Sequence, residues 1–266
     1  MLLLNLTGRD GMKYYDKLLK LKCFTMEDVY GFIPNVNTSQ SIIHEYSKKG
    51  YVQNVKRNLY ATLDLVTKEP VANKYEIASK ISKDSYVSYH SAFEYYGFNN
   101  QVSYEMLVSS TKRFAPFYFN GIKYSFINSK IDVGIELNSK IRVTNLERTI
   151  VDNIDAFSKY MGLEELLRRL EIIKYVNEGK LLEILAVYDK QFLYQKVGYI
   201  LSINKENLLL SDEFFDSCLS HIGKSKRYLY EELKLDEYSF NKQWKLILPK
   251  NIHLTTSKGI HANEII

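Results

Sequence analysis

The stretch at residues 37–64, NTSQSIIHEYSKKGYVQNVKRNLYATLD, constrains the fold more than any other part of this chain. Small polar residues open it, and apolar residues at helical spacing follow. Gly50 then favours a left-handed stop. Residues 51–55 and 59–62 have the composition of strands, with a basic turn between them. The stretch therefore predicts a helix followed by a β-hairpin.

Two shorter helical patterns precede this stretch. Residues 11–22 carry apolar side chains at helical spacing with lysines on the other face. Thr25, with Asp28 three residues later, is typical of a capping box at the start of a second helix. The order of helix, helix, helix and hairpin is that of a winged helix-turn-helix, which we predict for residues 1–66.

In such a unit the third helix enters the major groove of DNA and the hairpin lies along the phosphate backbone. Thr38 or Ser39 is predicted to cap the third helix. Short polar side chains at its exposed start can reach base edges or phosphates, and cations at the hairpin tip can meet phosphates. The same pattern also fits a small α+β unit with a solvated basic turn. The predicted DNA-binding residues are Thr38, Ser39, Gln40, His44, Lys48, Lys56, Arg57 and Asn58.

The distribution of charge agrees with contact to nucleic acid at the ends of the chain. The net charge is +5, and residues 1–66 carry nine Lys and Arg against six Asp and Glu. Residues 221–266 carry eight against five. An excess of three positive charges per segment is weak support by itself, because surface charge steers many kinds of association.

Cysteine usage and hydropathy indicate a cytoplasmic protein. Cys23 and Cys218 are far apart in the sequence, so they form neither a disulfide framework nor a metal cluster. The opening MLLLNL is too short for a signal sequence, and no apolar run is long enough to span a membrane. A soluble protein without membrane association is expected.

Pro70 marks the predicted boundary to a larger α+β domain at residues 70–266, with a possible further boundary near residue 200. Asn120-Gly121 predicts a hairpin within a small antiparallel sheet. The tail after Pro249 is poor in apolar residues and is expected to be partly disordered. Helices are predicted at residues 73–83, 85–98, 144–156, 162–176, 179–188 and 208–219, and strands at 103–111, 117–127, 140–143 and 243–248.

We find no pattern that predicts catalysis, a cofactor or a metal. The five histidines are scattered, and no glycine-rich phosphate loop is present. His90 and Ser91 lie on one predicted helix among aromatic residues, where a structural role is the better interpretation. Glu232 and Lys234 have the spacing of a nuclease motif, but this tripeptide is common by chance in Lys- and Glu-rich chains.

Two further segments resemble a known family. Residues 86–97, YVSYHSAFEYYG, and residues 146–152, LERTIVD, match recurring motifs of the AbiEi-type regulators. These are the antitoxin components of AbiE abortive-infection systems, a type IV toxin–antitoxin family. The resemblance covers roughly residues 10–200, and Phe93 departs from the leucine that is usual there.

The resemblance implies two roles. The N-terminal winged helix would bind inverted repeats in its own promoter and act as an autorepressor of a two-gene operon. The larger C-terminal part would counteract a nucleotidyltransferase-like toxin in phage defence, without a stable complex. Two alternatives stay open: a plain transcriptional regulator whose C-terminal domain senses a ligand or self-associates, and a nuclease that uses Glu232 and Lys234.

Overall fold

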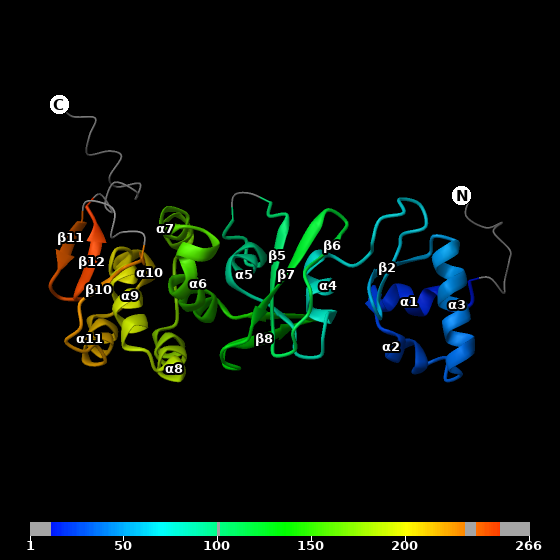
Figure 1. Cartoon of the computed structure of the whole chain (residues 1–266), viewed down its shortest axis with the longest axis horizontal. Helices are drawn as coiled ribbons and strands as arrows, with labels where there is room; N and C mark the ends of the chain where they lie inside the picture. Colours follow the sequence, from blue (N-terminus) through cyan, green and yellow to red (C-terminus); the bar gives the residue numbers. More distant parts are fainter. Residues whose placement is uncertain (1–11, 100–101, 232–237, 251–266) are drawn as a thin grey trace, which may run out of the picture. The chain divides into compact units, whose positions relative to one another are not determined.

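The computed structural model describes residues 12–99, 102–231 and 238–250 (Figure 1). These residues form a mixed α and β structure, as expected. They divide into two compact units. The first unit holds the described residues up to Val87 together with Tyr104–Asn128 and Asn138–Ile141. The second holds the described residues of Ser88–Ser103, Ser129–Leu137 and everything from Arg142 onward.

The first unit begins with three helices and a three-stranded antiparallel sheet of order β1-β3-β2. Two-residue strand β1 was not predicted, because only its pairing with Tyr60 and Ala61 of β3 defines it. The elements are α1 (Tyr15–Leu21), β1 (Cys23–Phe24), α2 (Met26–Tyr30), α3 (Val36–Lys48), β2 (Val52–Lys56) and β3 (Leu59–Thr62).

The N-cap residues of α2 and α3 explain where these two helices begin, and one of the two predicted caps has to be corrected. The capping box at Thr25 is confirmed, since the backbone N of Thr25 donates to Oδ2 of Asp28 at 2.7 Å. The cap of α3 is neither Thr38 nor Ser39. It is Asn35, whose side chain accepts a hydrogen bond from the backbone N of Thr38 at 2.9 Å. The helix therefore begins at Val36, earlier than predicted.

The remainder of the first unit carries a helix and most of a larger sheet. Asn120 and Gly121 have φ of 45° and 75°, which confirms the predicted hairpin between β6 and β7. Strands β5 and β7 pair in parallel, so the sheet is mixed rather than antiparallel throughout. Its order is β6-β7-β5-β4-β9-β8. The elements are α4 (Lys74–Lys80), β4 (Tyr86–Val87), β5 (Glu105–Ser110), β6 (Phe117–Phe119), β7 (Ile122–Asn128), β8 (Ile135–Asn138) and β9 (Ile141–Thr144). Of the last two strands only Asn138 and Ile141 belong to the first unit.

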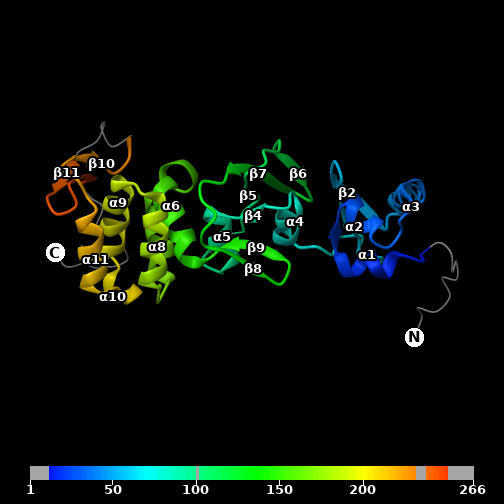
Figure 2. The same cartoon turned by 90° about the horizontal axis from the view of Figure 1, so that it is seen from below.

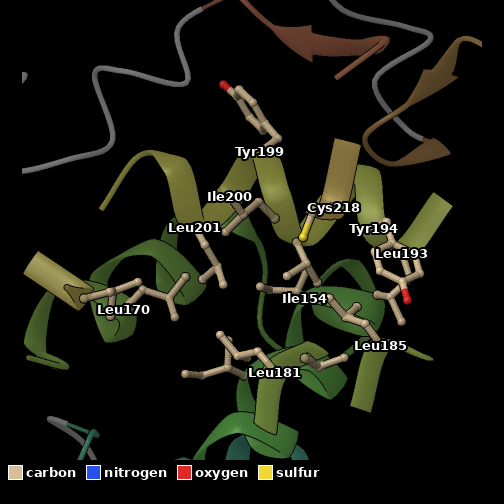
Figure 3. Packing of buried hydrophobic residues seen from close by; sticks show 14 of the residues in the cluster. Ile154, Leu170, Leu181, Leu185, Leu193, Tyr194, Tyr199, Ile200, Leu201 and Cys218 are labelled. Carbon is tan, nitrogen blue, oxygen red and sulfur yellow. The ribbon is translucent and has the colours of Figure 1, made fainter. Parts of the chain in front are cut away.

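The second unit is mainly helical, and α8, α9 and α11 lie side by side in it (Figure 2). Apolar side chains from several helices point toward one another in its core, among them Ile154, Leu181 and Leu201 (Figure 3). The helices are α5 (Tyr89–Tyr95), α6 (Leu146–Tyr160), α7 (Leu163–Ile172), α8 (Glu178–Tyr188), α9 (Gln191–Ser202), α10 (Lys205–Leu208) and α11 (Asp212–Ser220).

A small sheet of order β10-β12-β11 completes the second unit. Trp244 precedes β12 and is buried against Gly198 of α9, where a side chain would overlap its ring. The predicted tail after Pro249 lies, apart from Lys250, outside the described residues, as do Glu232 and Lys234. The strands are β10 (Arg227–Tyr228), β11 (Tyr238–Asn241) and β12 (Leu246–Pro249).

Within the described ranges, no helix is both long and apolar enough to cross a membrane. The same residues contain no group of three or more His, Cys, Asp or Glu side chains placed to hold a metal ion.

Candidate nucleic-acid interface

Helix α3 has one buried face and one polar exposed face. Ile43 and Tyr46 are 3% and 2% exposed, and they pack in the core of the N-terminal helices. The opposite face presents uncharged polar groups, cations and the carboxylate of Glu45 to solvent. Its members that were predicted to contact DNA are Thr38, Gln40, His44 and Lys48.

Ser39 does not belong to this exposed face. Its side chain is fully buried, and its Oγ donates to the backbone O of Val36 at 2.8 Å. The expectation that Ser39 is exposed is therefore wrong. The sequence held a signal for this, since Ser39, Ile43 and Tyr46 follow the i, i+4, i+7 spacing of a single helical face.

The charges on α3 leave one cation available near its end. Glu45 pairs with Lys49 one turn later, with Nζ and Oε1 2.5 Å apart. Lys48 has no such ion pair among the residues that the structure describes. A cation in the last turn also interacts favourably with the helix dipole. Lys48 therefore supplies an uncompensated positive charge on the exposed face.

The hairpin of β2 and β3 turns at Arg57 and Asn58. Asn58 has a φ of 60°, and its Oδ1 accepts from the backbone N of Met26 at 3.1 Å. Its Nδ2 donates to Glu27 at 2.9 Å, and this hydrogen bond lowers the pKa of the Glu27 carboxyl. Both ends of the Asn58 amide therefore anchor the turn to α2. The side chain of Asn58 thus has a structural role in the turn, and its contact with DNA stays a prediction.

The two cations of the hairpin differ in their surroundings. Lys56 is half-buried, with its Nζ 5.0 Å from the ring centre of Phe114 and 5.5 Å from that of Phe117. Burial lowers the pKa of Lys56. Arg57 is exposed at the turn itself. Of the two predicted wing cations, the structure thus leaves Arg57 free to meet an outside anion and engages Lys56 within the first unit.

Helix α3 and β2 are adjacent and are joined through Gly50, whose φ of 67° reverses the chain. The backbone N of Tyr51 donates to the O of Tyr46 at 2.9 Å and fixes this junction. The helix face and the hairpin are thus parts of one packed unit. The predicted residues that are exposed there, and whose side chains form no hydrogen bond or ion pair with the described part of the chain, are Thr38, Gln40, His44, Lys48 and Arg57.

Residues 146–152, LERTIVD, which in sequence resemble a motif of the AbiEi-type regulators, are largely buried. Arg148 and Asp152 of α6 are 2% and 1% exposed and form an ion pair. The hydroxyl of Tyr188 donates to Asp152 from α8. No sequence pattern indicated that Tyr188 is a partner of this pair. The arrangement is a closed polar cluster within the second unit, and it explains the motif as a structural element.

The first shared motif is also largely internal. Ser88, the N-cap residue of α5, and Ser91 are fully buried, and His90 is 8% exposed. The structural interpretation of His90 and Ser91 accords with this burial.

No protein-family model matches the chain, and no curated protein matches it. The crystal structure of the RV2827C protein from Mycobacterium tuberculosis is similar to it, with a TM-score of 0.59 and 12% sequence identity. The match covers 90% of this chain and 91% of that chain. At this identity the likeness shows a similar fold and nothing of function.

Proposed function

We propose that the N-terminal helices and hairpin are a winged helix-turn-helix that binds double-stranded DNA. The observation that carries this proposal is the division of α3 into a buried face and an exposed face of Thr38, Gln40, His44 and Lys48. Amide, hydroxyl and imidazole groups can read base edges in a major groove, and Lys48 can contact a phosphate. Arg57 at the hairpin tip adds a second phosphate contact.

The biological role that fits this activity is that of an autorepressor and antitoxin. It rests on the sequence resemblance to AbiEi-type regulators over residues 86–97 and 146–152. In this role the protein represses its own promoter and counteracts a nucleotidyltransferase-like toxin. Co-expression tests the second part: growth arrest caused by a nucleotidyltransferase-like neighbour should be relieved by this protein and not by an empty vector.

DNA binding is tested with two duplexes of equal length, one from the region upstream of this gene and one scrambled. Fluorescence anisotropy should show tighter binding to the upstream duplex. Gln40→Ala combined with His44→Ala removes two candidate base contacts, of which that of the Gln40 amide can be bidentate and worth about 1–3 kcal/mol of discrimination. We expect at least about tenfold weaker binding to the upstream duplex and little change with the scrambled one. Equal, weak binding of the wild type to both duplexes contradicts the proposal.

A further inference from the structure

Lys56 immediately precedes the hairpin turn, and its side chain is directed at two aromatic rings of the same unit. Its Nζ lies 5.0 Å and 5.5 Å from the ring centres of Phe114 and Phe117. Among the described residues no carboxylate forms an ion pair with it. The faces of the two rings are therefore the main electrostatic partners of this half-buried ammonium group.

The two rings are themselves held in place by the larger sheet. Phe114 is 8% exposed and meets the Phe126 ring of β7 edge to face, with centroids 5.4 Å apart. Phe117 of β6 stacks on Tyr124 of β7 at 4.9 Å. Phe114 and Phe117 also meet each other at 6.2 Å. Because both rings pack on β7, they form a rigid platform for the Lys56 side chain.

A second contact ties the same two parts of the first unit together. Asn120, in the turn between β6 and β7, donates through Nδ2 to Glu69 at 3.1 Å. Glu69 follows the hairpin in the sequence, and its backbone O accepts from Asp64 at 2.9 Å. The hairpin is thus attached to the β6–β7 segment at its tip, through Lys56, and behind its last strand, through Glu69.

We propose that Phe114 and Phe117 are positioning residues for DNA binding: through Lys56 they fix the hairpin so that Arg57 meets a phosphate. This inference rests on the proposed function. A two-residue turn leaves little freedom between Lys56 and Arg57, so holding the first restrains the second. Lys56 itself then makes no phosphate contact, although the sequence alone suggests that it does.

The test compares four changes in the full chain. Phe114→Leu with Phe117→Leu removes the ring faces and keeps apolar volume. Lys56→Met keeps the stem and removes the charge, and Lys56→Arg keeps a cation that can stack. Tyr118→Leu is the matched control, because Tyr118 lies next to Phe117 on β6 and is 74% exposed. Each variant is assayed for DNA affinity across a salt series, and the phenylalanine and tyrosine variants also for trypsin cleavage after Lys56 and Arg57.

We expect the double phenylalanine variant to bind the upstream duplex about fivefold more weakly, a factor that corresponds to ~1 kcal/mol, within the range of a cation–π contact. Its hairpin should be cleaved about fivefold faster. The slope of log K against log salt should stay at the wild-type value, because no phosphate contact is lost. Lys56→Met should show the same loss of affinity and the same unchanged salt slope, while Lys56→Arg and Tyr118→Leu should bind DNA like the wild type.

A drop of about one in the salt slope for Lys56→Met overturns the inference, since it would show that Lys56 contacts a phosphate. Unchanged affinity and cleavage in the double phenylalanine variant overturn it as well. If the wild type binds no DNA, the proposed function fails and the positioning role fails with it. The cleavage rates then show by themselves whether the aromatic pair holds the hairpin.

Discussion

Arg148 and Asp152 lie one turn apart on α6 and form an ion pair that is closed to solvent, with Nε 2.8 Å from each carboxylate oxygen. Nη1 of Arg148 also donates to the backbone O of Val133 at 2.6 Å. The pair therefore joins the start of α6 to the loop before β8. Buried pairs of this kind hold a structure in place because each member is costly to leave alone.

Asp152→Asn should destabilise the protein strongly. The change leaves Arg148 buried without its counter-charge, and the expected loss is about 3 kcal/mol of unfolding free energy. Urea denaturation followed by circular dichroism measures it. Arg168→Ala is the control, because Arg168 is 56% exposed and its pairs with Glu164 and Glu165 should contribute less than about 1 kcal/mol. A similar small loss in both variants would show that the pair is not buried.

Asp84 should make the unfolding free energy of the protein depend on pH in the acidic range. Burial alone would raise the pKa of its carboxyl, but hydrogen bonds from Thr111, Ser82 and Ser110 outweigh this and hold the pKa far below its ordinary value. A depressed native pKa contributes stability that is complete above the unfolded value of about 3.9 and is lost as pH falls toward the native value.

Asp84→Asn should accordingly cost about 1–2 kcal/mol at pH 7, as expected for hydrogen bonds to a charged group. The difference from the wild type should shrink as the pH is lowered from 5 toward 2. Denaturation curves at a series of pH values give both the difference in unfolding free energy at pH 7 and its change with pH. A difference that stays constant over this range would contradict the role of the ionised carboxylate.

Gly198→Ala should disturb the core of the second unit. A Cβ at this position would lie 2.1 Å from Cζ3 and 2.2 Å from Cη2 of Trp244, so the ring or the helix must move. Overpacking of this kind typically costs about 1–3 kcal/mol. Trp244→Phe removes the overlapping atoms, so adding Gly198→Ala to that variant should cost clearly less. Thermal denaturation of the two single variants and the double variant measures the coupling, and strict additivity would refute the contact.

Local signals in the sequence predicted the elements that depend on local chemistry. The capping box of Thr25 and Asp28 and the Asn120-Gly121 turn are found where they were expected. Residues 86–87 were assigned to a helix, yet they form β4, because Tyr86 and Val87 pair with Ser109 and Val108 of β5. A pairing partner so far along the chain leaves no periodic trace in a two-residue strand.

For the candidate interface, too, some features could be predicted from the sequence and others could not. The polar character of the third helix could be predicted, and the spacing of Ser39 with Ile43 and Tyr46 held the information that Ser39 is buried. The engagement of Lys56 could not be predicted. Its partners, Phe114 and Phe117, lie in another part of the sequence and are brought to it only by the packing of the first unit.

The most direct test of DNA binding is a salt series with the upstream duplex. The wild type is compared with Lys48→Ala/Arg57→Ala. Arg168→Ala, which removes one exposed cation from the second unit, and Ser39→Ala, on the buried face of α3, are the controls. We expect the slope of log K against log salt to fall by about two in the double variant, one for each lost phosphate contact, and to stay unchanged in both controls. An unchanged slope in the double variant would contradict DNA binding through α3 and the hairpin.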